Sequence, residues 1–328
     1  MKDIPFMEVP QVLLDAALSR ARKQASAYPK QKTAFYTIKG KEIVKIEVSA
    51  AYLEKALFRS VQEFPNFDEL SPFYRDLYGC IINTDELRKN IASISSVARL
   101  ILKLRRDAIV KLKELRYARG AESKSVQITK SYIGRIASLI NSLSKKIEYY
   151  NECARVLREL PSIRANEECI ILAGYPNVGK STLLGKLTES KPQIAAYPFT
   201  TTGLNVGVFK KRYLPIQVID TPGLLDRPLS ERNDIELKAI AALQHLKGVI
   251  AFVVDPADDL KRQKNLFAEV KKLFTRHKFL IVLTKSDIAS QEQLNEAKKT
   301  FDGTQIVIEG NGLNTLKDLL LDKEFKLE

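Results

Sequence analysis

The sequence predicts an α + α/β protein of two domains, with an antiparallel helical bundle over residues 1–160 and an α/β domain over residues 161–328. Three observations predict this organisation. Apolar residues recur at helical spacing through the first half, whereas short apolar runs alternate with amphipathic stretches in the second. Pro161 lies where the pattern changes, and a length of 328 residues is typical of two domains.

The longest apolar stripes lie in the second part of the predicted bundle. Residues 133–157 and residues 94–115 each carry apolar side chains three and four positions apart, and Gly120 with its polar neighbours allows a reversal between them. This arrangement predicts an antiparallel hairpin of two long helices, closed into a bundle by two shorter ones. Residues 43–48 carry the only strand signal of this half. The predicted helices cover residues 9–27, 49–63, 85–118 and 124–159.

The second half predicts a mainly parallel, doubly wound sheet, because its apolar runs are short and helical stretches separate most of them. The predicted strands cover residues 169–173, 204–209, 216–219, 248–254, 279–284 and 305–308. The predicted helices cover residues 180–188, 231–246, 258–275, 290–300 and 313–321.

The charge of the chain is unevenly distributed. The formal net charge is +14, and residues 1–168 carry 30 Lys and Arg against 20 Asp and Glu. A basic excess on one domain is typical of proteins that bind nucleic acid or ribosomes. The N-terminal domain is therefore the candidate for RNA binding.

Several classes of protein are excluded by composition. No apolar run approaches the ~20 residues that span a bilayer, so we expect no membrane segment. The first residues contain acidic side chains and no long apolar core, which argues against a secretory signal. Three widely spaced cysteines indicate a reducing compartment and neither a disulfide framework nor a zinc site. We therefore expect a cytoplasmic protein.

The strongest motif is G-Y-P-N-V-G-K-S at residues 174–181, directly after a predicted strand and before a predicted helix. In such a P-loop, successive backbone N–H groups and a helix N-terminus face one anion. Lys180 then reaches the β- and γ-phosphates of a nucleotide, and the hydroxyl of Ser181 binds Mg²⁺. The predicted phosphate-binding residues are Gly174, Asn177, Val178, Gly179, Lys180, Ser181, Thr182 and Gly223.

The nucleotide base is predicted from T-K-S-D at residues 284–287, which follows an apolar strand. Asp287 can accept hydrogen bonds from guanine N1–H and the exocyclic amine, a pair of donors that adenine lacks. The aliphatic part of Lys285 would pack along the base, and Thr284 completes the predicted guanine site. GTP is therefore predicted, and an ATP-using enzyme is disfavoured.

Two further loops are predicted to respond to the nucleotide. In D-T-P-G at residues 220–223, Asp220 can hold Mg²⁺ through water and the Gly223 N–H can contact the γ-phosphate. The loop 197–203 supplies hydroxyls, of which Thr201, with Thr200 as the next choice, completes the Mg²⁺ shell. The predicted switch residues are Tyr197, Phe199, Thr200, Thr201, Asp220, Thr221, Pro222 and Gly223.

The combination of G-Y-P-N-V-G-K-S, Y-P-F-T-T and D-T-P-G-L-L-D-R-P resembles the Obg–Nog group of GTPases. A helical domain before an unpermuted G domain resembles, over nearly the full length, the Nog-type nucleolar GTP-binding protein family. The resemblance implies a GTPase that acts in assembly of the large ribosomal subunit through ribosomal RNA and other assembly factors. Eukaryotic members continue beyond the point where this chain ends, so a compact, archaeal-like form is implied.

This chain departs from many GTPases at two positions. Leu224 stands where a glutamine would orient the attacking water, which predicts a slow intrinsic rate. In GTPases with a similar P-N-x-G-K loop and a hydrophobic residue at the glutamine position, the asparagine helps to hold K⁺, so Asn177 is a candidate K⁺ ligand. Residues 308–312 stand in place of the Ser-Ala pair that contacts guanine O6 in many GTPases, so that contact is not assigned.

Basic residues on the first long helix lie largely away from its apolar stripe and could meet RNA phosphates. We therefore expect a switch in which GTP and Mg²⁺ order the loops 190–203 and 220–235 and the bundle docks on pre-ribosomal RNA. The alternative is a GTPase whose bundle binds a protein partner, with no role on RNA. The candidate RNA contacts are Arg99, Lys103, Arg106, Lys113, Arg116 and Arg119.

Overall fold

The computed structural model divides the chain into two compact units. The first contains Met1–Pro65 and Ile82–Arg158, and the second contains Asn66–Ile81 and Glu159–Glu328. The predicted boundary differs from this division, because residues 66–81 fold with the second unit; Pro161 itself lies outside the described residues. The structure describes residues 4–160, 162–188, 193–195, 204–211 and 214–308.

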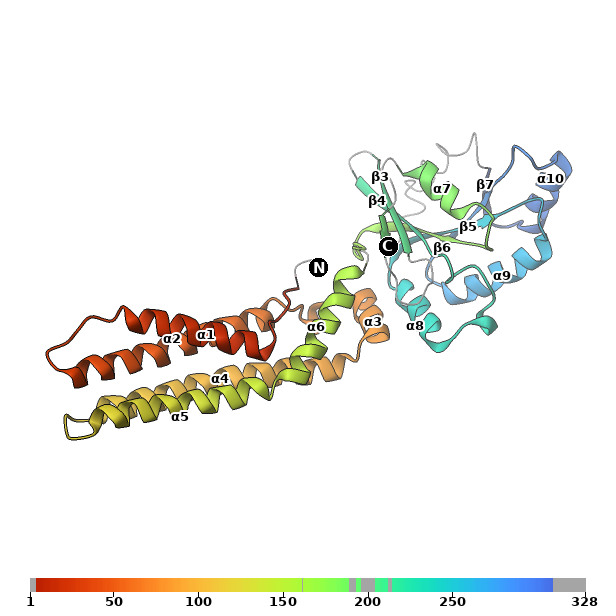
Figure 1. Cartoon of the computed structure of the whole chain (residues 1–328). Helices are drawn as coiled ribbons and strands as arrows, with labels where there is room; N and C mark the ends of the chain where they lie inside the picture. Colours follow the sequence, from red (N-terminus) through yellow and green to blue (C-terminus); the bar gives the residue numbers. More distant parts are fainter. Residues whose placement is uncertain (1–3, 161, 189–192, 196–203, 212–213, 309–328) are drawn as a thin grey trace. The chain divides into compact units, whose positions relative to one another are not determined.

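The first unit is a bundle of long helices (Figure 1), so the predicted helical domain is confirmed. The apolar stripes of its helices share one core, in which Leu53, Ile101 and Ile136 are fully buried. None of the helices within the described ranges is both long enough and apolar enough to cross a lipid bilayer. The bundle helices are α1 (Pro10–Ser26), α2 (Ala34–Gln62), α4 (Thr84–Glu114), α5 (Ala121–Asn141) and α6 (Ser144–Glu159).

Helix α2 begins well before the predicted start at residue 49, and it includes residues 43–48. The strand signal of that run therefore does not lead to a strand. The Tyr36 N–H donates to Thr33 Oγ1, which caps the new start. Within α2, buried side chains such as Ile46 and Leu53 continue one apolar stripe, and burial of this stripe outweighs the β-preference of the β-branched residues.

The predicted helix over residues 124–159 is interrupted, and it forms α5 and α6 instead. Ser142 Oγ donates to Leu139 O at 2.7 Å, a local bond that competes with the helical pattern. The Leu143 N–H donates to Ile140 O at 3.1 Å, three residues back, which tightens the turn. Leu143 is nevertheless fully buried, so the apolar stripe continues across the break.

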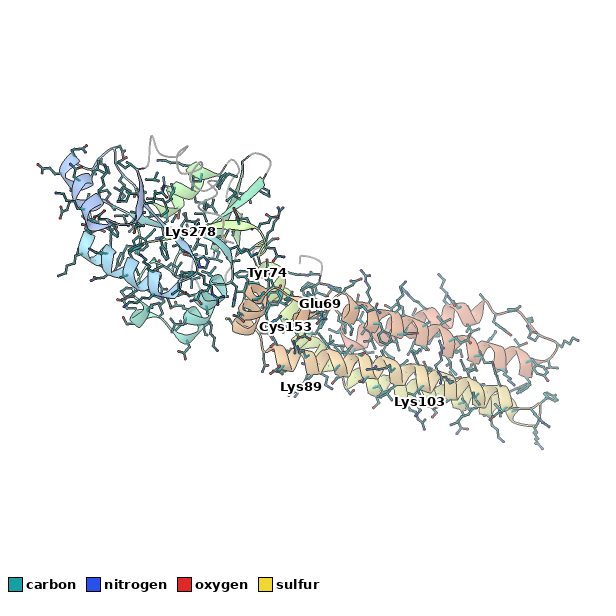
Figure 2. The ribbon with its side chains drawn as sticks, turned by 180° about the vertical axis from the view of Figure 1, so that it is seen from behind. Glu69, Tyr74, Lys89, Lys103, Cys153 and Lys278 are labelled. Carbon is teal, nitrogen blue, oxygen red and sulfur yellow. The ribbon has the colours of Figure 1, made fainter. Side chains whose placement is uncertain are left out.

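A short helix that the sequence analysis did not predict, α3 (Pro72–Ile81), belongs to the second unit and packs against α8 (Asp234–Leu243). Tyr74, labelled in Figure 2, lies on α3. Its Oη donates to Ile163 O at 2.6 Å and accepts from the Ile163 N–H at 2.9 Å. Burial raises the pKa of Tyr74, which keeps its hydroxyl a donor. His245 Nε2 lies 2.8 Å from Asp76 Oδ2. These contacts join α3 to the start and the middle of the α/β fold.

The second unit is a mixed, mostly parallel sheet with helices on both faces, which confirms the predicted fold class. The strand order is β2-β3-β4-β1-β5-β6-β7. Among the described strands, β3 runs antiparallel to both of its neighbours, β2 and β4, and the other neighbouring pairs are parallel. Figure 1 shows α7 on one face, with α8 and α9 on the other. The strands are β1 (Glu168–Ala173), β2 (Gln193–Ala195), β3 (Leu204–Lys211), β4 (Leu214–Asp220), β5 (Lys247–Val254), β6 (Lys278–Leu283) and β7 (Gln305–Ile308), and the remaining helices are α7 (Lys180–Leu187), α9 (Leu260–Leu273) and α10 (Gln291–Thr300).

The strand register brings four strand ends to one edge of the sheet. Leu172 of β1 pairs with Asp220 of β4, and Ala173 pairs with Phe252 of β5. On the other side of β5, Val254 pairs with Leu283, the last residue of β6. The loops that leave this edge carry the P-loop, D-T-P-G and T-K-S-D motifs. In doubly wound folds this is the edge at which ligands bind.

Candidate functional site

The P-loop (residues 174–181) leaves β1 and leads into α7. Its backbone has positive φ angles of 136° at Gly174, 63° at Asn177 and 100° at Gly179. A Cβ on Gly174 would overlap the carbonyl oxygen of Val253, so glycine is required there on two counts. Because α7 begins at Lys180, the N–H groups of its first turn lack helical partners beside the loop. This backbone geometry is typical of a loop whose N–H groups can face an anion.

Lys180 is buried in this loop with only 7% of its surface exposed. Its Nζ donates to Gly174 O at 2.8 Å and to Tyr175 O at 2.7 Å, so the loop's own carbonyls hold the ammonium. Burial lowers the pKa of Lys180, and the carboxylates of Asp220 and Asp226 oppose this shift. The pKa of Lys180 is thus set by burial in one direction and by two nearby carboxylates in the other.

Ser181 and Asp220 meet beside the loop. Ser181 Oγ donates to Asp220 Oδ2 at 2.7 Å, and Asn205 Nδ2 donates to the same oxygen at 3.2 Å. The other oxygen of Asp220 is buried and has no hydrogen-bond partner. A carboxylate oxygen with an open lone pair next to a hydroxyl fits a hard cation such as Mg²⁺. Within the described ranges, no cluster of three His, Cys, Asp or Glu side chains could hold a metal by itself.

In the D-T-P-G segment, Thr221 contacts the backbone of a neighbouring strand, whereas Gly223 contacts a side chain. Thr221 Oγ1 donates to Leu172 O at 2.9 Å and is fully buried, so this predicted switch residue anchors β4 to β1. Gly223 has a φ of 80°, and its N–H donates to Asp226 Oδ2 at 2.7 Å. Leu224 is fully buried, which keeps its side chain away from any bound phosphate.

A charged network follows Gly223, and the sequence analysis gave its members no role. Arg232 Nη1 donates to Gly223 O at 2.7 Å, and its Nη2 donates to Arg227 O at 2.9 Å. Arg227 Nη2 in turn donates to both carboxylate oxygens of Glu236, at 2.8 and 3.0 Å. The signal that could have found this network is the density of charges around residues 226–236, between a glycine turn and a helix start.

The T-K-S-D segment lies next to the P-loop. Thr284 Oγ1 donates to Val178 O at 2.6 Å and to Val254 O at 3.1 Å, so this buried hydroxyl ties the loop to β5. Lys285 has a φ of 52°, and its Nζ donates to Asp255 Oδ2 at 2.7 Å. Asp255 was not predicted. Asp287 is exposed beyond this turn, where a base can reach it.

The structure brings most of the predicted nucleotide-site residues together at the carboxyl edge of the sheet. Val178 is buried under the P-loop, Thr182 is exposed in the first turn of α7, and Pro222 is half-buried before Gly223. The other predicted residues lie outside the described residues: Tyr197, Phe199, Thr200 and Thr201, together with residues 309–312 and the predicted helix over residues 313–321.

The six predicted RNA contacts are all exposed on the first unit. Four of them lie on α4 at positions 99, 103, 106 and 113, a spacing that places them on one face of the helix. Figure 2 labels Lys103 among the side chains of α4. Arg116 and Arg119 follow in the turn between α4 and α5. This set of six side chains is called the basic face below.

An aromatic side chain that the sequence analysis missed extends the basic face. Tyr117, in the turn between α4 and α5, is 70% exposed, and its ring packs edge-on against Phe35 with centroids 5.8 Å apart. Lys39 Nζ secures the turn by donating to Lys113 O at 3.0 Å and to Leu115 O at 2.9 Å. Exposed aromatic rings beside cations are typical of surfaces that stack unpaired bases.

Two family models match successive parts of the chain. Residues 2–164 match the family model described as the NOG1 N-terminal helical domain. Residues 169–285 match the model described as a 50S ribosome-binding GTPase. The second match contains the P-loop and D-T-P-G and ends within T-K-S-D.

Individual relatives agree with these matches. An uncharacterized protein of Methanocaldococcus jannaschii is 32% identical over 89% of this chain and 82% of its own length. Nucleolar GTP-binding protein 1 of Saccharomyces cerevisiae is 30% identical over 90% of this chain, which spans 46% of that relative. The chain thus spans about half the length of the nucleolar relatives that it matches.

Among solved structures, nucleolar GTP-binding protein 1 of Plasmodium falciparum is 32% identical, with a TM-score of 0.42, over 49% of this chain and 88% of that chain. The helical domain and the GTPase domain are matched in the order in which this fold presents them, and the archaeal relative shares most of both chains. The chain belongs to the NOG1 family of P-loop GTPases.

Proposed function

We propose that this chain is a GTP-dependent switch in the assembly of the large ribosomal subunit. In this proposal the bundle docks on ribosomal RNA and assembly factors of the subunit precursor. The observation that carries it is the presence, in one chain, of a P-loop GTPase site and of an exposed basic face on a separate helical unit. Membership of the NOG1 family supports it, because the matched GTPase model is a ribosome-binding one.

The site residues have separate tasks in this proposal. The P-loop N–H groups and Lys180 hold the β- and γ-phosphates, and Asp287 accepts from the guanine edge. Ser181, Asp220 and Thr201 would hold Mg²⁺, which neutralises charge on the phosphate oxygens when bound. The buried, unpaired oxygen of Asp220 supports this assignment. Positioning and electrostatics then dominate phosphoryl transfer.

The structure supports a slow intrinsic rate, because the buried Leu224 cannot orient a water molecule. We propose that K⁺ at Asn177 supplies part of the missing charge. Turnover of GTP is then expected to be at least about threefold faster in KCl than in NaCl at matched ionic strength. The Asn177→Ala variant should lose the difference while still binding GDP. Equal rates of the unmodified protein in the two salts would exclude the K⁺ site.

Ribosome docking is tested by co-sedimentation. The unmodified protein should sediment with large subunits or their precursors in a non-hydrolysable GTP analogue and be released in GDP. If the bundle captures a protein equally well from extracts with and without ribosomes, the alternative is favoured. In that alternative the protein is a GTPase whose bundle binds a protein partner. Exposed Leu100 and Val110 on α4 are the features that such a partner would contact.

The basic face predicts salt-sensitive RNA binding. Each phosphate contact contributes about 0.7–0.9 to the slope of log K against log salt. Replacing Arg99, Lys103 and Arg106 with glutamine should therefore reduce the slope by about two and weaken binding at low salt. The measurement is fluorescence anisotropy with a large-subunit RNA fragment at several KCl concentrations.

The matched control removes the same charge from the second unit. Its three residues are exposed on or just after α9. If the effect depended only on the net charge of the protein, the salt slope of RNA binding would fall equally in both variants. An equal loss of slope in the control would remove the basic face from the proposal. The control replaces Lys264, Lys272 and Arg276 with glutamine.

We place the protein in the cytoplasm. Its three cysteines, Cys80, Cys153 and Cys169, are all free thiols in the structure. Burial raises the pKa of Cys169 to about 12, which leaves this thiol inert. Unpaired cysteines support a reducing compartment.

A further inference from the structure

The Gly223 N–H has two candidate acceptors. The D-T-P-G motif predicts that it contacts the γ-phosphate, whereas in the structure it donates to Asp226 Oδ2 at 2.7 Å. One N–H cannot serve both anions at full strength, and a carboxylate beside a phosphate adds repulsion. Asp226 and a γ-phosphate therefore compete for this donor.

The surroundings of Asp226 indicate where its carboxylate can turn. Oδ1 is buried and has no hydrogen-bond partner, and it lies 3.6 Å from Arg232 Nη2. The guanidinium of Arg232 is nearly inaccessible, with 1% side-chain exposure, and is fixed by the carbonyl oxygens of Gly223 and Arg227. Asp226 and Arg232 are thus already ion-paired, and a small rotation of Asp226 toward this fixed cation would shorten the pair to hydrogen-bond distance.

Asp226 also lies within electrostatic reach of the phosphate site, because its carboxylate acts on the ammonium of Lys180. The 2.7 Å bond to the Gly223 N–H places its negative charge beside the predicted γ-phosphate donor. Asp226 and the γ-phosphate would thus share the Gly223 N–H as donor and the Lys180 ammonium as cation.

We propose that Asp226 is an internal stand-in for the γ-phosphate, which occupies the Gly223 N–H until GTP displaces it toward Arg232. This inference rests on the proposed GTPase function and assigns a positioning residue within it. Arg232 holds Gly223 and Arg227, and Arg227 pairs with Glu236 in α8. Displacement of Asp226 toward Arg232 would therefore act on the segment between Gly223 and α8.

The test compares nucleotide affinities rather than activity. The Asp226→Ala variant should bind a non-hydrolysable GTP analogue about tenfold more tightly, because the competing anion is gone. Its affinity for GDP should stay within about twofold, because GDP does not use the Gly223 donor. The Asp226→Asn variant keeps an acceptor but no charge, so it should show a smaller gain of about threefold. Both affinities are measured by fluorescence with labelled nucleotides.

A control variant, Asp234→Ala, and a second variant, Asp226→Asn, allow the result to support or contradict the stand-in role. Asp234→Ala removes an exposed carboxylate at the start of α8 and should change neither affinity. If Asp226→Ala does not fold, as judged by circular dichroism, the isosteric Asp226→Asn variant decides. An unchanged ratio of GTP-analogue to GDP affinity, or weaker analogue binding, would overturn the stand-in role while GDP binding persists. Failure of the unmodified protein to bind any guanine nucleotide would instead overturn the proposed function.

Discussion

Replacing Lys180 with alanine is expected to lower the affinity for GTP by at least about a hundredfold and to abolish measurable turnover. The ammonium is buried and is already held by the carbonyl oxygens of Gly174 and Tyr175. Such a fixed cation needs little reorganisation to stabilise charge that develops on the phosphates. Without it, the anion would face only main-chain donors.

The measurement is the binding of labelled GTP together with single-turnover hydrolysis. Lys186→Ala, which changes an exposed lysine on the same helix, is the control and should retain both properties. The expected loss greatly exceeds what an exposed charge contributes. If Lys180→Ala retains its affinity within about threefold, the P-loop is not the phosphate site of this chain.

Replacing Asp287 with asparagine is expected to change the preferred base. A carboxylate accepts from both guanine N1–H and the exocyclic amine, and an amide at the same place offers a donor where the amine needs an acceptor. GTP binding should weaken by about a hundredfold, because the two donors of the base lose their charged acceptor. Xanthosine triphosphate, which has a carbonyl oxygen in place of the amine, should bind better than GTP.

Competition of GTP, ATP and xanthosine triphosphate against one labelled nucleotide measures this preference. Glu292→Gln neutralises an exposed carboxylate in the first turn of α10 and should leave the preference unchanged. An Asp287→Asn variant with the purine preference of the unmodified protein would show that another residue reads the base. The Lys285–Asp255 ion pair would then be the next candidate to examine.

The fold was predictable where one local pattern carries the information. The stripe on residues 94–115 identifies α4, and short apolar runs identify β1 and β5. The pattern failed where tertiary burial overrides local preference, as in the β-branched run of α2. It also missed α3, whose apolar residues are covered by a helix far away in sequence.

The candidate site was also predictable only where a local motif carries the information. Motif residues such as Lys180 and Asp220 follow predicted strands directly, so sequence alone places them at one edge. Asn205, Asp255 and Asp226 were missed because each acts through a partner that only the folded chain supplies. Thr221 is predicted as a switch residue and Thr284 as part of the guanine site, and in the structure both hydroxyls donate to backbone carbonyls.

The position of α3 in the sequence affects whether the two units can be separated. Because this helix is encoded within the first half but folds into the second unit, the chain passes between the units three times, after Pro65, Ile81 and Arg158. A fragment that starts after the bundle would lack the tyrosine that clamps Ile163 and the helix that covers α8. Neither unit is a contiguous stretch of the sequence, so a single cut in the chain cannot separate one complete unit from the other.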